Sequence, residues 1–170
     1  MVVVLMGVSG SGKTTIGTEL ARETGMTFAD ADDYHSEANK AKMHAGIALT
    51  DEDREPWLET LNRLILGWLA GSTDGVLACS ALKASYRATL SADTPAGCVR
   101  FVLLDAPKAV IAERLEARQG TFMNPALLDS QLQTLERPRE GEPTLCVEND
   151  RTPAEVARRI AEQLASPKHG

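Results

Sequence analysis

The chain of 170 residues is 43% hydrophobic and carries a formal net charge of −6, from 24 acidic and 18 basic residues. A chain of this length can bury about 70% of its unfolded surface around one core, so we expect a single domain over residues 1–170. An acidic balance with only two Trp and two Tyr gives no basic, aromatic-rich stripe. The composition therefore argues against nucleic acid as a partner.

The cysteines and the first residues bear on the compartment. Cys79, Cys98 and Cys146 are far apart, odd in number and set in or beside apolar runs, unlike a disulfide framework or metal-ligand spacing. We expect reduced thiols in the core. The opening MVVVLMG is too short for a signal-peptide core or a membrane span, and it lacks a basic leader. We therefore expect a cytoplasmic protein without a membrane partner.

Short apolar runs recur along the chain and predict buried strands. They lie at residues 2–6, 26–29, 76–79, 99–104 and 145–147. Longer helix-compatible stretches separate them, a pattern typical of a parallel sheet with right-handed crossovers and helices on both faces. The sequence thus predicts a three-layer α/β fold with a mainly parallel five-stranded sheet.

Two helices carry clear sequence signals. In DEDREPWLETLNRLILGWLAG apolar residues recur at helical spacing, with Pro56 near the start and Gly71 as a stop. We expect Trp57 and Trp68 of this helix to lie in the core and not at a substrate. The string TPAE at residues 152–155 predicts a capping box that begins the last helix.

A polar segment at about residues 118–142, RQGTFMNPALLDSQLQTLERPREGE, interrupts the alternation of strands and helices. Long connections of this kind frequently close over binding sites. We expect a mobile lid here. The alternative is an ordinary surface helix with its loops.

Between the first strand and the next helical stretch stands GVSGSGKT, which matches the phosphate-binding pattern G-x-x-x-x-G-K-[ST]. Its glycines let backbone N–H groups converge on phosphate oxygens at a helix N-terminus. We expect Lys13 to bridge the β- and γ-phosphates of ATP and Thr14 to hold Mg²⁺. A glycine-rich turn without function would explain neither residue. The predicted nucleotide-binding residues are Gly7, Val8, Ser9, Gly10, Ser11, Gly12, Lys13, Thr14 and Thr15.

A P-loop enzyme also needs an acid near Mg²⁺, and the later strand GVLACSALK offers none. The nearest supply is FADADDYH, residues 28–35. In extended backbone Asp30 and Asp32 would share one face, whereas Asp33 would point away. One acid could then order metal-bound water while the other aligns a substrate hydroxyl for in-line attack. The alternative makes these acids turn residues or a helix N-cap, which suits Asp33.

Several motifs together resemble one family, the small P-loop gluconokinases, which are related to shikimate kinase and the nucleoside monophosphate kinases. They are LMGVSGSGKTT, DADDYHSEANKAKMHAGIALTDEDREPWL, VLACSALKASYRATL, RLEARQGTFM and LLDSQLQTLERP, in the family's order across essentially the whole chain. The resemblance implies a P-loop kinase fold and ATP-dependent phosphorylation of the 6-hydroxyl of D-gluconate, giving 6-phospho-D-gluconate and ADP. A homodimer also fits the family.

Gluconate is a flexible, polyhydroxylated monoanion, so its site should offer a cation to the carboxylate and fixed polar groups to the hydroxyls. The resemblance implies Asp30 near Mg²⁺ and Asp32 at the accepting hydroxyl. The other residues expected at the acceptor are His35, Lys42, Arg54, Ser80, Lys83 and Arg87. For Lys42 and Arg87 a salt bridge or a solvated surface is the alternative, and for Arg54 it is pairing within its own helix.

Arg114 and Arg118 are four residues apart on one helix face that can approach ATP. The resemblance implies that Arg118 neutralises charge on the transferring phosphoryl group, and that Arg114, with Pro153 opposite, contacts the adenine. Gln131 matches the family pattern and is expected to contact the substrate when the lid closes.

The chain departs from the family pattern at three positions. Thr121 stands where the lid usually carries histidine, so that histidine's role is not carried over and acceptor selectivity stays open. Ser36 and Ala48 replace prolines, which changes backbone stiffness without removing a functional group. Two other functions fit the sequence: a kinase for another small sugar acid or polyol, and a nucleotide-binding regulator without turnover.

Overall fold

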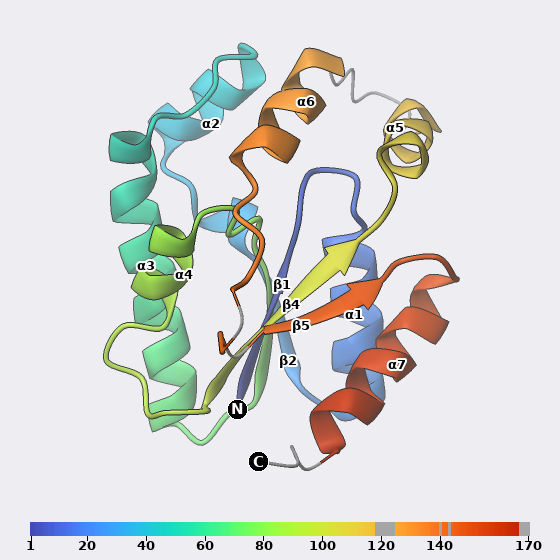
Figure 1. The fold of residues 1–170 in the computed structure, drawn as a ribbon. Coiled ribbons are helices and arrows are strands. Elements are labelled where there is room, and N and C mark those ends of the chain that lie inside the picture. Colours follow the sequence, from blue (N-terminus) through green and yellow to red (C-terminus); the bar gives the residue numbers. More distant parts are fainter. Residues whose placement is uncertain (118–124, 140, 143, 167–170) are drawn as a thin grey trace.

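The structure, a computed structural model, describes residues 1–117, 125–139, 141–142 and 144–166 (Figure 1). Every predicted strand is present, with its ends within one residue of the expected ones. The elements are β1 Val2–Met6, α1 Lys13–Thr24, β2 Thr27–Asp30, the 3₁₀ helix η1 Ala31–Tyr34, α2 Glu37–His44, α3 Asp51–Ala70, β3 Gly75–Ala78, α4 Ala84–Leu90, β4 Val99–Asp105, α5 Lys108–Ala117, α6 Pro125–Thr134, β5 Thr144–Glu148 and α7 Pro153–Ala165.

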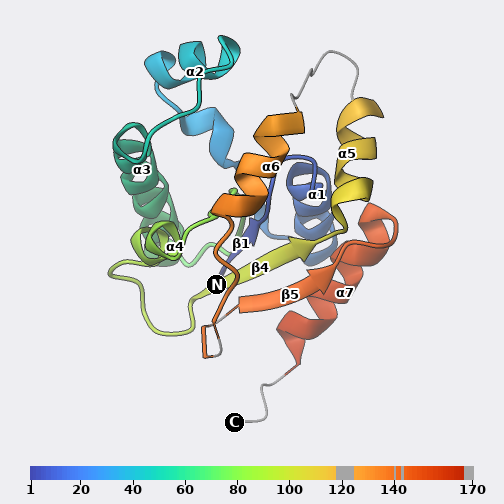
Figure 2. The same ribbon diagram turned by 45° about the horizontal axis from the view of Figure 1, so that its top comes forward.

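The five strands form one sheet in the order β2-β3-β1-β4-β5, and each neighbouring pair is parallel. β1 is completely buried at the centre. The chain passes from β1 to the edge strand β2, returns to β3 beside β1, and then crosses to β4 on the other side of β1. Ligands of open α/β sheets bind at the carboxyl ends of the strands beside such a change of direction. Figures 1 and 2 show α2, α5 and α6 above this edge of the sheet.

Helices cover both faces of the sheet because every second residue of β1 points to the opposite side. Val4 and Met6 belong to a core cluster with residues of α3 and α4. Val3 and Leu5 belong to a second cluster with residues of α1 and α7. Figure 1 shows these two helix pairs on opposite sides of the sheet. The predicted three-layer α/β fold is confirmed.

α3 begins at Asp51, the first residue of the string that predicted it, and ends before Gly71. Thr50 and Asp53 form a capping box at its N-terminus, and Pro56 lies inside the helix near its start. Trp57 is buried and Trp68 packs against the same core cluster, as predicted. The predicted capping box of Thr152 and Glu155 begins α7.

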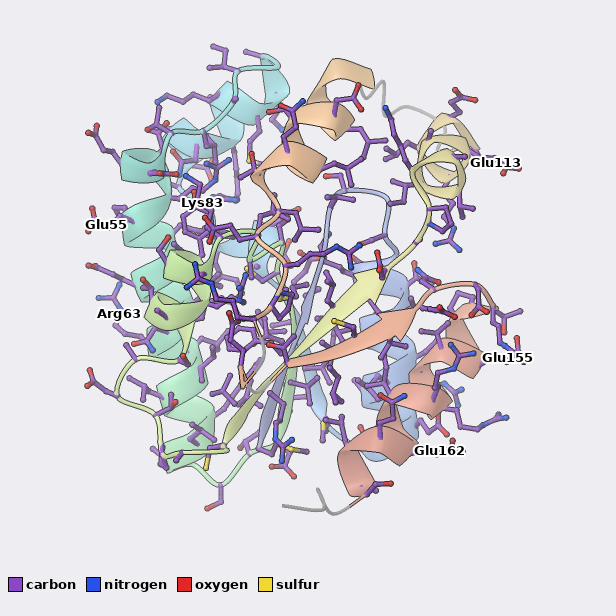
Figure 3. The ribbon with its side chains drawn as sticks, in the orientation of Figure 1. Glu55, Arg63, Lys83, Glu113, Glu155 and Glu162 are labelled. Carbon is purple, nitrogen blue, oxygen red and sulfur yellow. The ribbon has the colours of Figure 1, made fainter. Side chains whose placement is uncertain are left out.

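The outer surfaces of the helices carry charged side chains. Glu55, Arg63, Glu113 and Glu162 are exposed on α3, α5 and α7 (Figure 3). None of the helices in the described ranges is long and apolar enough to cross a membrane.

The three cysteines are free thiols, but they are not all in the core. Cys79 is buried and Cys98 is half-buried, whereas Cys146 is exposed. The core prediction is therefore wrong for Cys146, because β5 forms an edge of the sheet and that residue faces outward.

Candidate active site

Residues 7–14 form the turn between β1 and α1. Gly10 and Gly12 have φ angles of 81° and 84°, in the left-handed region where glycine is favoured. α1 begins at Lys13, so its first N–H groups, which have no partner within the helix, face this turn. The Lys13 Nζ donates to two backbone carbonyls of the turn, at 3.0 Å each. Turn and helix N-terminus together have the form of a phosphate cradle.

Asn149, directly after β5, supports this cradle through a hydrogen bond. Its side chain is buried and its Nδ2 donates to the Ser11 carbonyl at 2.6 Å. Its backbone N–H donates to the carbonyl of Asp105 at 2.7 Å, and the Arg114 Nη2 donates to the Asn149 carbonyl at 3.1 Å. Asn149 therefore joins the ends of β4 and β5, and α5, to the phosphate-binding turn.

A pocket of about 320 Å³ lies in front of the turn, at the carboxyl edge of the sheet. It brings together residues that were predicted from four separate stretches of the sequence. The lining residues are Ser9, Gly10, Gly12, Lys13, Thr14, Thr15, Ile16, Asp30, Asp32, Ala78, Cys79, Ser80, Arg114, Asn149, Arg151 and Pro153. Residues predicted for the phosphates, the metal and the adenine thus reach one cavity, together with two of those predicted for the acceptor, Asp32 and Ser80.

Both acids predicted for chemistry line the pocket, but the backbone reason given for them was wrong. Asp30 ends β2, and Asp32 lies in η1 and not in extended chain. The Asp30 Oδ1 accepts the Asp32 N–H at 3.0 Å, so Asp30 caps the 3₁₀ turn. That turn, and not a shared strand face, places the two carboxylates together. Asp33 lies in the same turn, as its turn interpretation predicts, while Ser36 caps α2.

The pair Thr14 and Asp30 has the donor set that Mg²⁺ requires. The Thr14 Oγ1 donates to the Asp30 Oδ2 at 2.6 Å, which puts a hydroxyl and a carboxylate oxygen side by side. Mg²⁺ prefers such oxygen ligands and completes its shell with water and phosphate. Within the described ranges no group of three or more His, Cys, Asp or Glu residues forms a metal site. The residues therefore fit a metal held jointly with a nucleotide.

Two groups that line the pocket have shifted pKa values, the Asp32 carboxylate and the Cys79 thiol. Desolvation, and then the neighbouring Asp30 carboxylate, raise the pKa of Asp32, while Lys13 acts against this shift. A raised pKa makes Asp32 a better proton acceptor than an ordinary aspartate. Burial raises the pKa of Cys79 to about 12, so this thiol stays protonated and is not a nucleophile.

His35 follows the 3₁₀ turn and is held by an aromatic contact. Its ring stacks on Trp57, with centroids 4.2 Å apart, and the Trp57 Nε1 donates to the Ala31 carbonyl at 2.8 Å. The His35 Nε2 lies 3.9 Å from the Asp32 Oδ1, and its Nδ1 has no hydrogen-bond partner in the described part of the chain. Burial, more than any other cause, lowers the pKa of His35. The imidazole is therefore neutral and can donate to a hydroxyl.

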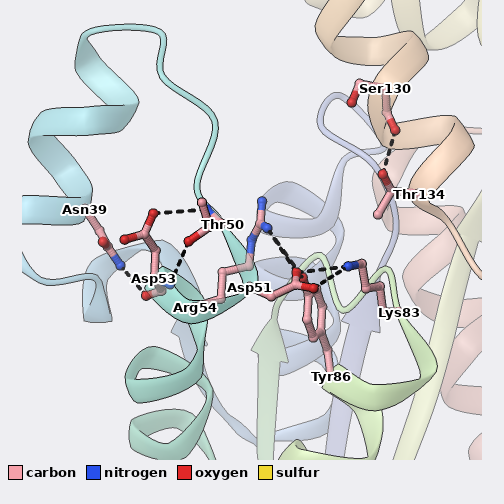
Figure 4. A network of polar contacts seen from close by, with 9 residues as sticks. All are labelled: Asn39, Thr50, Asp51, Asp53, Arg54, Lys83, Tyr86, Ser130 and Thr134. Atoms are coloured by element: carbon pink, nitrogen blue, oxygen red, sulfur yellow. Dashed lines mark hydrogen bonds and ion pairs between the residues drawn. The ribbon is translucent and has the colours of Figure 1, made fainter.

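Two of the cations predicted for the acceptor, Lys83 and Arg54, contact the same carboxylate, that of Asp51. Lys83, at the N-cap of α4, bonds to both oxygens of Asp51 at 2.9 and 2.7 Å. Arg54 lies 3.8 Å from the same carboxylate, and the Tyr86 hydroxyl donates to it (Figure 4). Arg54 also lowers the pKa of the nearby His35. Neither Arg54 nor Lys83 is among the residues that line the 320 Å³ pocket, but Lys83 follows the pocket residue Ser80 by three positions.

Lys42 has a different environment. Its Nζ bonds to both Asp53 oxygens, at 2.7 and 2.9 Å, and this hydrogen bond is the main cause that lowers the pKa of Asp53 to about 2. Asp53 is also the N3 residue of the capping box that begins α3. The salt-bridge interpretation of Lys42 describes this arrangement, and the residue does not line the 320 Å³ pocket.

Arg87 was predicted at the acceptor, but the structure turns it into the interior. Arg87 is only 4% exposed, and its guanidinium pairs with the Glu142 carboxylate at 3.0 Å. Its Nη1 donates to the carbonyls of Ala81 and Glu136, at 3.4 and 3.0 Å. The alternative of a structural salt bridge therefore describes Arg87, because its donors are directed to the protein and away from the pocket.

Arg87→Met is expected to lower the free energy of unfolding by about 3 kcal/mol, because it leaves Glu142 and two carbonyls without their donor. Chemical denaturation would measure this, with the exposed Arg63→Met on α3 as control, for which we expect little change. A residue that bound the acceptor would instead raise the acceptor KM and leave stability unchanged.

Gln131 of α6 lies against the phosphate-binding turn. Its Oε1 accepts the Ser9 N–H at 2.7 Å, and its Nε2 donates to the Ser9 Oγ at 3.2 Å. The contact with the acceptor that the sequence suggested stays a prediction. Arg118 and Thr121 lie outside the described residues.

Some residues of the site were not anticipated. Asn149 and Arg151 follow a predicted strand, so the rule that polar groups gather at carboxyl strand ends could have found them. Asp51 and Tyr86 stood inside recognised blocks, but only the tertiary structure places them on the same cations. Their sequence separation of 35 residues hides that contact.

Comparisons with known proteins extend over most of the chain. The family model described as an AAA domain matches residues 2–138. The chain is 47% identical over 146 residues to a probable gluconokinase of Dictyostelium discoideum, covering 84% of this chain and 73% of that one. It is 42% identical over 158 residues to a gluconokinase of Gluconobacter oxydans, covering 93% and 88%.

Solved structures give the same relationship. The crystal structure of a gluconokinase from Sinorhizobium meliloti 1021 matches with a TM-score of 0.85 at 42% identity, over 96% of this chain and 90% of that one. Shikimate kinase from Aquifex aeolicus matches with a TM-score of 0.60 at 20% identity and shares the fold.

Proposed function

The chain belongs to the gluconokinase family and phosphorylates D-gluconate with ATP; we propose that the phosphoryl group passes directly to the 6-hydroxyl, giving 6-phospho-D-gluconate and ADP. One observation carries the proposal. Lys13 of the phosphate cradle, the two acids Asp30 and Asp32, and Ser80 of the predicted acceptor turn line a single pocket. The donor and acceptor of the phosphoryl group can therefore meet there.

In the proposed transfer, the 6-oxygen of gluconate forms a bond to the γ-phosphorus while the bond to the β-γ bridging oxygen breaks and ADP leaves. The Asp32 carboxylate accepts the proton of the attacking hydroxyl, and its raised pKa suits this role. Neutral His35, beside Asp32, donates to a substrate hydroxyl and fixes the chain of the sugar acid. Catalysis comes from positioning and electrostatics, without a covalent enzyme intermediate.

Lys13 and the cradle hold the triphosphate. Lys13 exchanges its carbonyl contacts for phosphate oxygens and balances their charge. Thr14 and Asp30 would hold Mg²⁺, which when bound neutralises charge on the β- and γ-phosphates. Arg114 and Pro153 line the pocket where the adenine is proposed to lie. Arg118 remains a proposed phosphate ligand on the basis of the family pattern.

Gluconate-dependent ADP release is expected to saturate, with a kcat of about 1–100 s⁻¹ that is typical of kinases. A coupled ADP assay with gluconate, other sugar acids, shikimate and nucleoside monophosphates would measure kcat/KM for each acceptor. Product analysis should locate the phosphate at the 6-position. A clear preference for another acceptor, or ATP binding without any phosphorylated product, would contradict the proposal.

A further inference from the structure

Two of the cations predicted for the acceptor, Arg54 and Lys83, lie close together on one aromatic ring. The guanidinium carbon of Arg54 and the Nζ of Lys83 are 5.8 and 5.5 Å from the ring centre of Tyr86. Their side chains are only 31% and 29% exposed, so water screens their mutual repulsion incompletely. Such an arrangement is stable when an anion lies between the cations.

Asp51 supplies that anion in the protein itself. Figure 4 shows Arg54 and Lys83 approaching its carboxylate from opposite sides in the view, with Tyr86 below. Asp51 begins α3, whereas Lys83 and Tyr86 belong to the start of α4, so the group joins two helices. We call Asp51, Arg54, Lys83 and Tyr86 the head-group site.

The two cations are paired unequally. Lys83 has both Asp51 oxygens within hydrogen-bond distance, which also raises its pKa. Within the described residues, Arg54 makes one long hydrogen bond of 3.4 Å, to the Tyr86 hydroxyl, and one ion pair of 3.8 Å. Its guanidinium therefore keeps donors for a carboxylate of the substrate. Two cations and one carboxylate leave the head-group site with one net positive charge.

Helix stabilisation does not account for this arrangement. An acid in the first turn of α3 favours the helix dipole wherever its side chain points. Glu52, the next residue, provides the same charge, yet in the described part of the chain it makes no ion pair with either cation. Helix stabilisation therefore does not explain why the Asp51 side chain contacts Arg54 and Lys83.

We propose that Asp51 determines acceptor specificity by setting the head-group site at one net positive charge, which matches a monocarboxylate and disfavours a dianionic phosphate monoester. This inference rests on the proposed function. One route to selectivity is an element that acts against the wrong ligand, and the Asp51 carboxylate would repel a second negative charge at that position. Sugar alcohols and acids would thereby be separated from their phosphorylated counterparts.

Acceptors that share carbons 2–6 of gluconate and differ in the head group test this directly. D-Glucitol carries no charge, D-gluconate carries one, and glucitol 1-phosphate carries about −1.5 to −2 near pH 7, each with a free 6-hydroxyl. The measured quantity is kcat/KM for the phosphate relative to gluconate. Asp51→Asn is expected to raise this ratio about fivefold, the effect of about 1 kcal/mol at a partly exposed site.

Three further variants separate charge from other causes. Asp51→Glu keeps the charge and should keep the wild-type ratio, and Glu52→Gln, a matched loss of charge in the same helical turn, should also leave it unchanged. Lys83→Met lowers the net charge of the site to zero and should shift the ratio against the phosphate, which provides a test if Asp51→Asn does not fold.

An unchanged ratio in folded Asp51→Asn, or an equal shift in Glu52→Gln, would overturn the role of Asp51. A purely structural Asp51 would lower kcat/KM for all three acceptors in proportion and leave their ratios constant. Failure of the proposed function is recognised separately, because the wild-type protein would then form no product with gluconate.

Discussion

Asp32→Asn is expected to lower kcat by about 10³-fold, the usual effect of removing a general base, while the affinity for ATP is retained. Asparagine has almost the same shape but cannot take the proton of the attacking hydroxyl. The loss should fall on kcat because Asp32 acts mainly in the transition state. Lys13 and the rest of the cradle, which hold the nucleotide, are left intact.

Single-turnover kinetics and an equilibrium titration with ATP would separate the two effects. Asp33→Asn is the matched control, because Asp33 lies in the same 3₁₀ turn and is not among the pocket-lining residues. Since the pKa of Asp32 is raised, wild-type kcat/KM should fall as the pH drops through that raised value and the carboxylate becomes protonated. A near-normal kcat in Asp32→Asn would exclude the assignment.

Lys13→Met is expected to lower kcat/KM for ATP by about 10²–10³-fold, the range found when one stabilising donor is removed from a transition state. Unlike the loss in Asp32→Asn, this one should appear in both KM for ATP and kcat, because Lys13 meets the phosphates in the bound state as well as during transfer.

Steady-state kinetics with varied ATP at saturating gluconate would measure this loss. Lys40→Met removes the same charge from the exposed face of α2, where Lys40 pairs with Glu37, and should have little effect. A Lys13→Met variant with unchanged kcat/KM for ATP would show that the cradle is not the nucleotide site.

The phosphate cradle could be predicted from the sequence because its physics is local. A buried strand, a glycine-rich turn and a helix N-terminus are consecutive, so positions 7–14 contain the whole motif. Asp30 and Asp32 could also be found, since a strand that ends near them delivers them to the carboxyl edge of the sheet. Their backbone geometry could not, because no local pattern shows that Asp30, at the end of its strand, also accepts the Asp32 N–H and caps a 3₁₀ turn.

The features of the site that could not be predicted from the sequence depend on contacts between residues far apart in the chain. Asn149 meets Ser11 across 138 positions, and Gln131 meets Ser9 across 122. Nothing in the local pattern around Arg87 distinguishes a substrate ligand from a buried structural cation, because both require the same residue type. Only packing against Glu142 decides between them.

The interior position of Arg87 also limits how α6 can move. Just beyond the end of α6, the Glu136 N–H donates to the Leu82 carbonyl, its carboxylate accepts the Ala84 N–H, and its carbonyl accepts from Arg87. These bonds attach that end of the helix to the turn that carries Ser80 and Lys83. Glu136 and Gln131 therefore join the acceptor turn, through α6, to the phosphate-binding turn at Ser9.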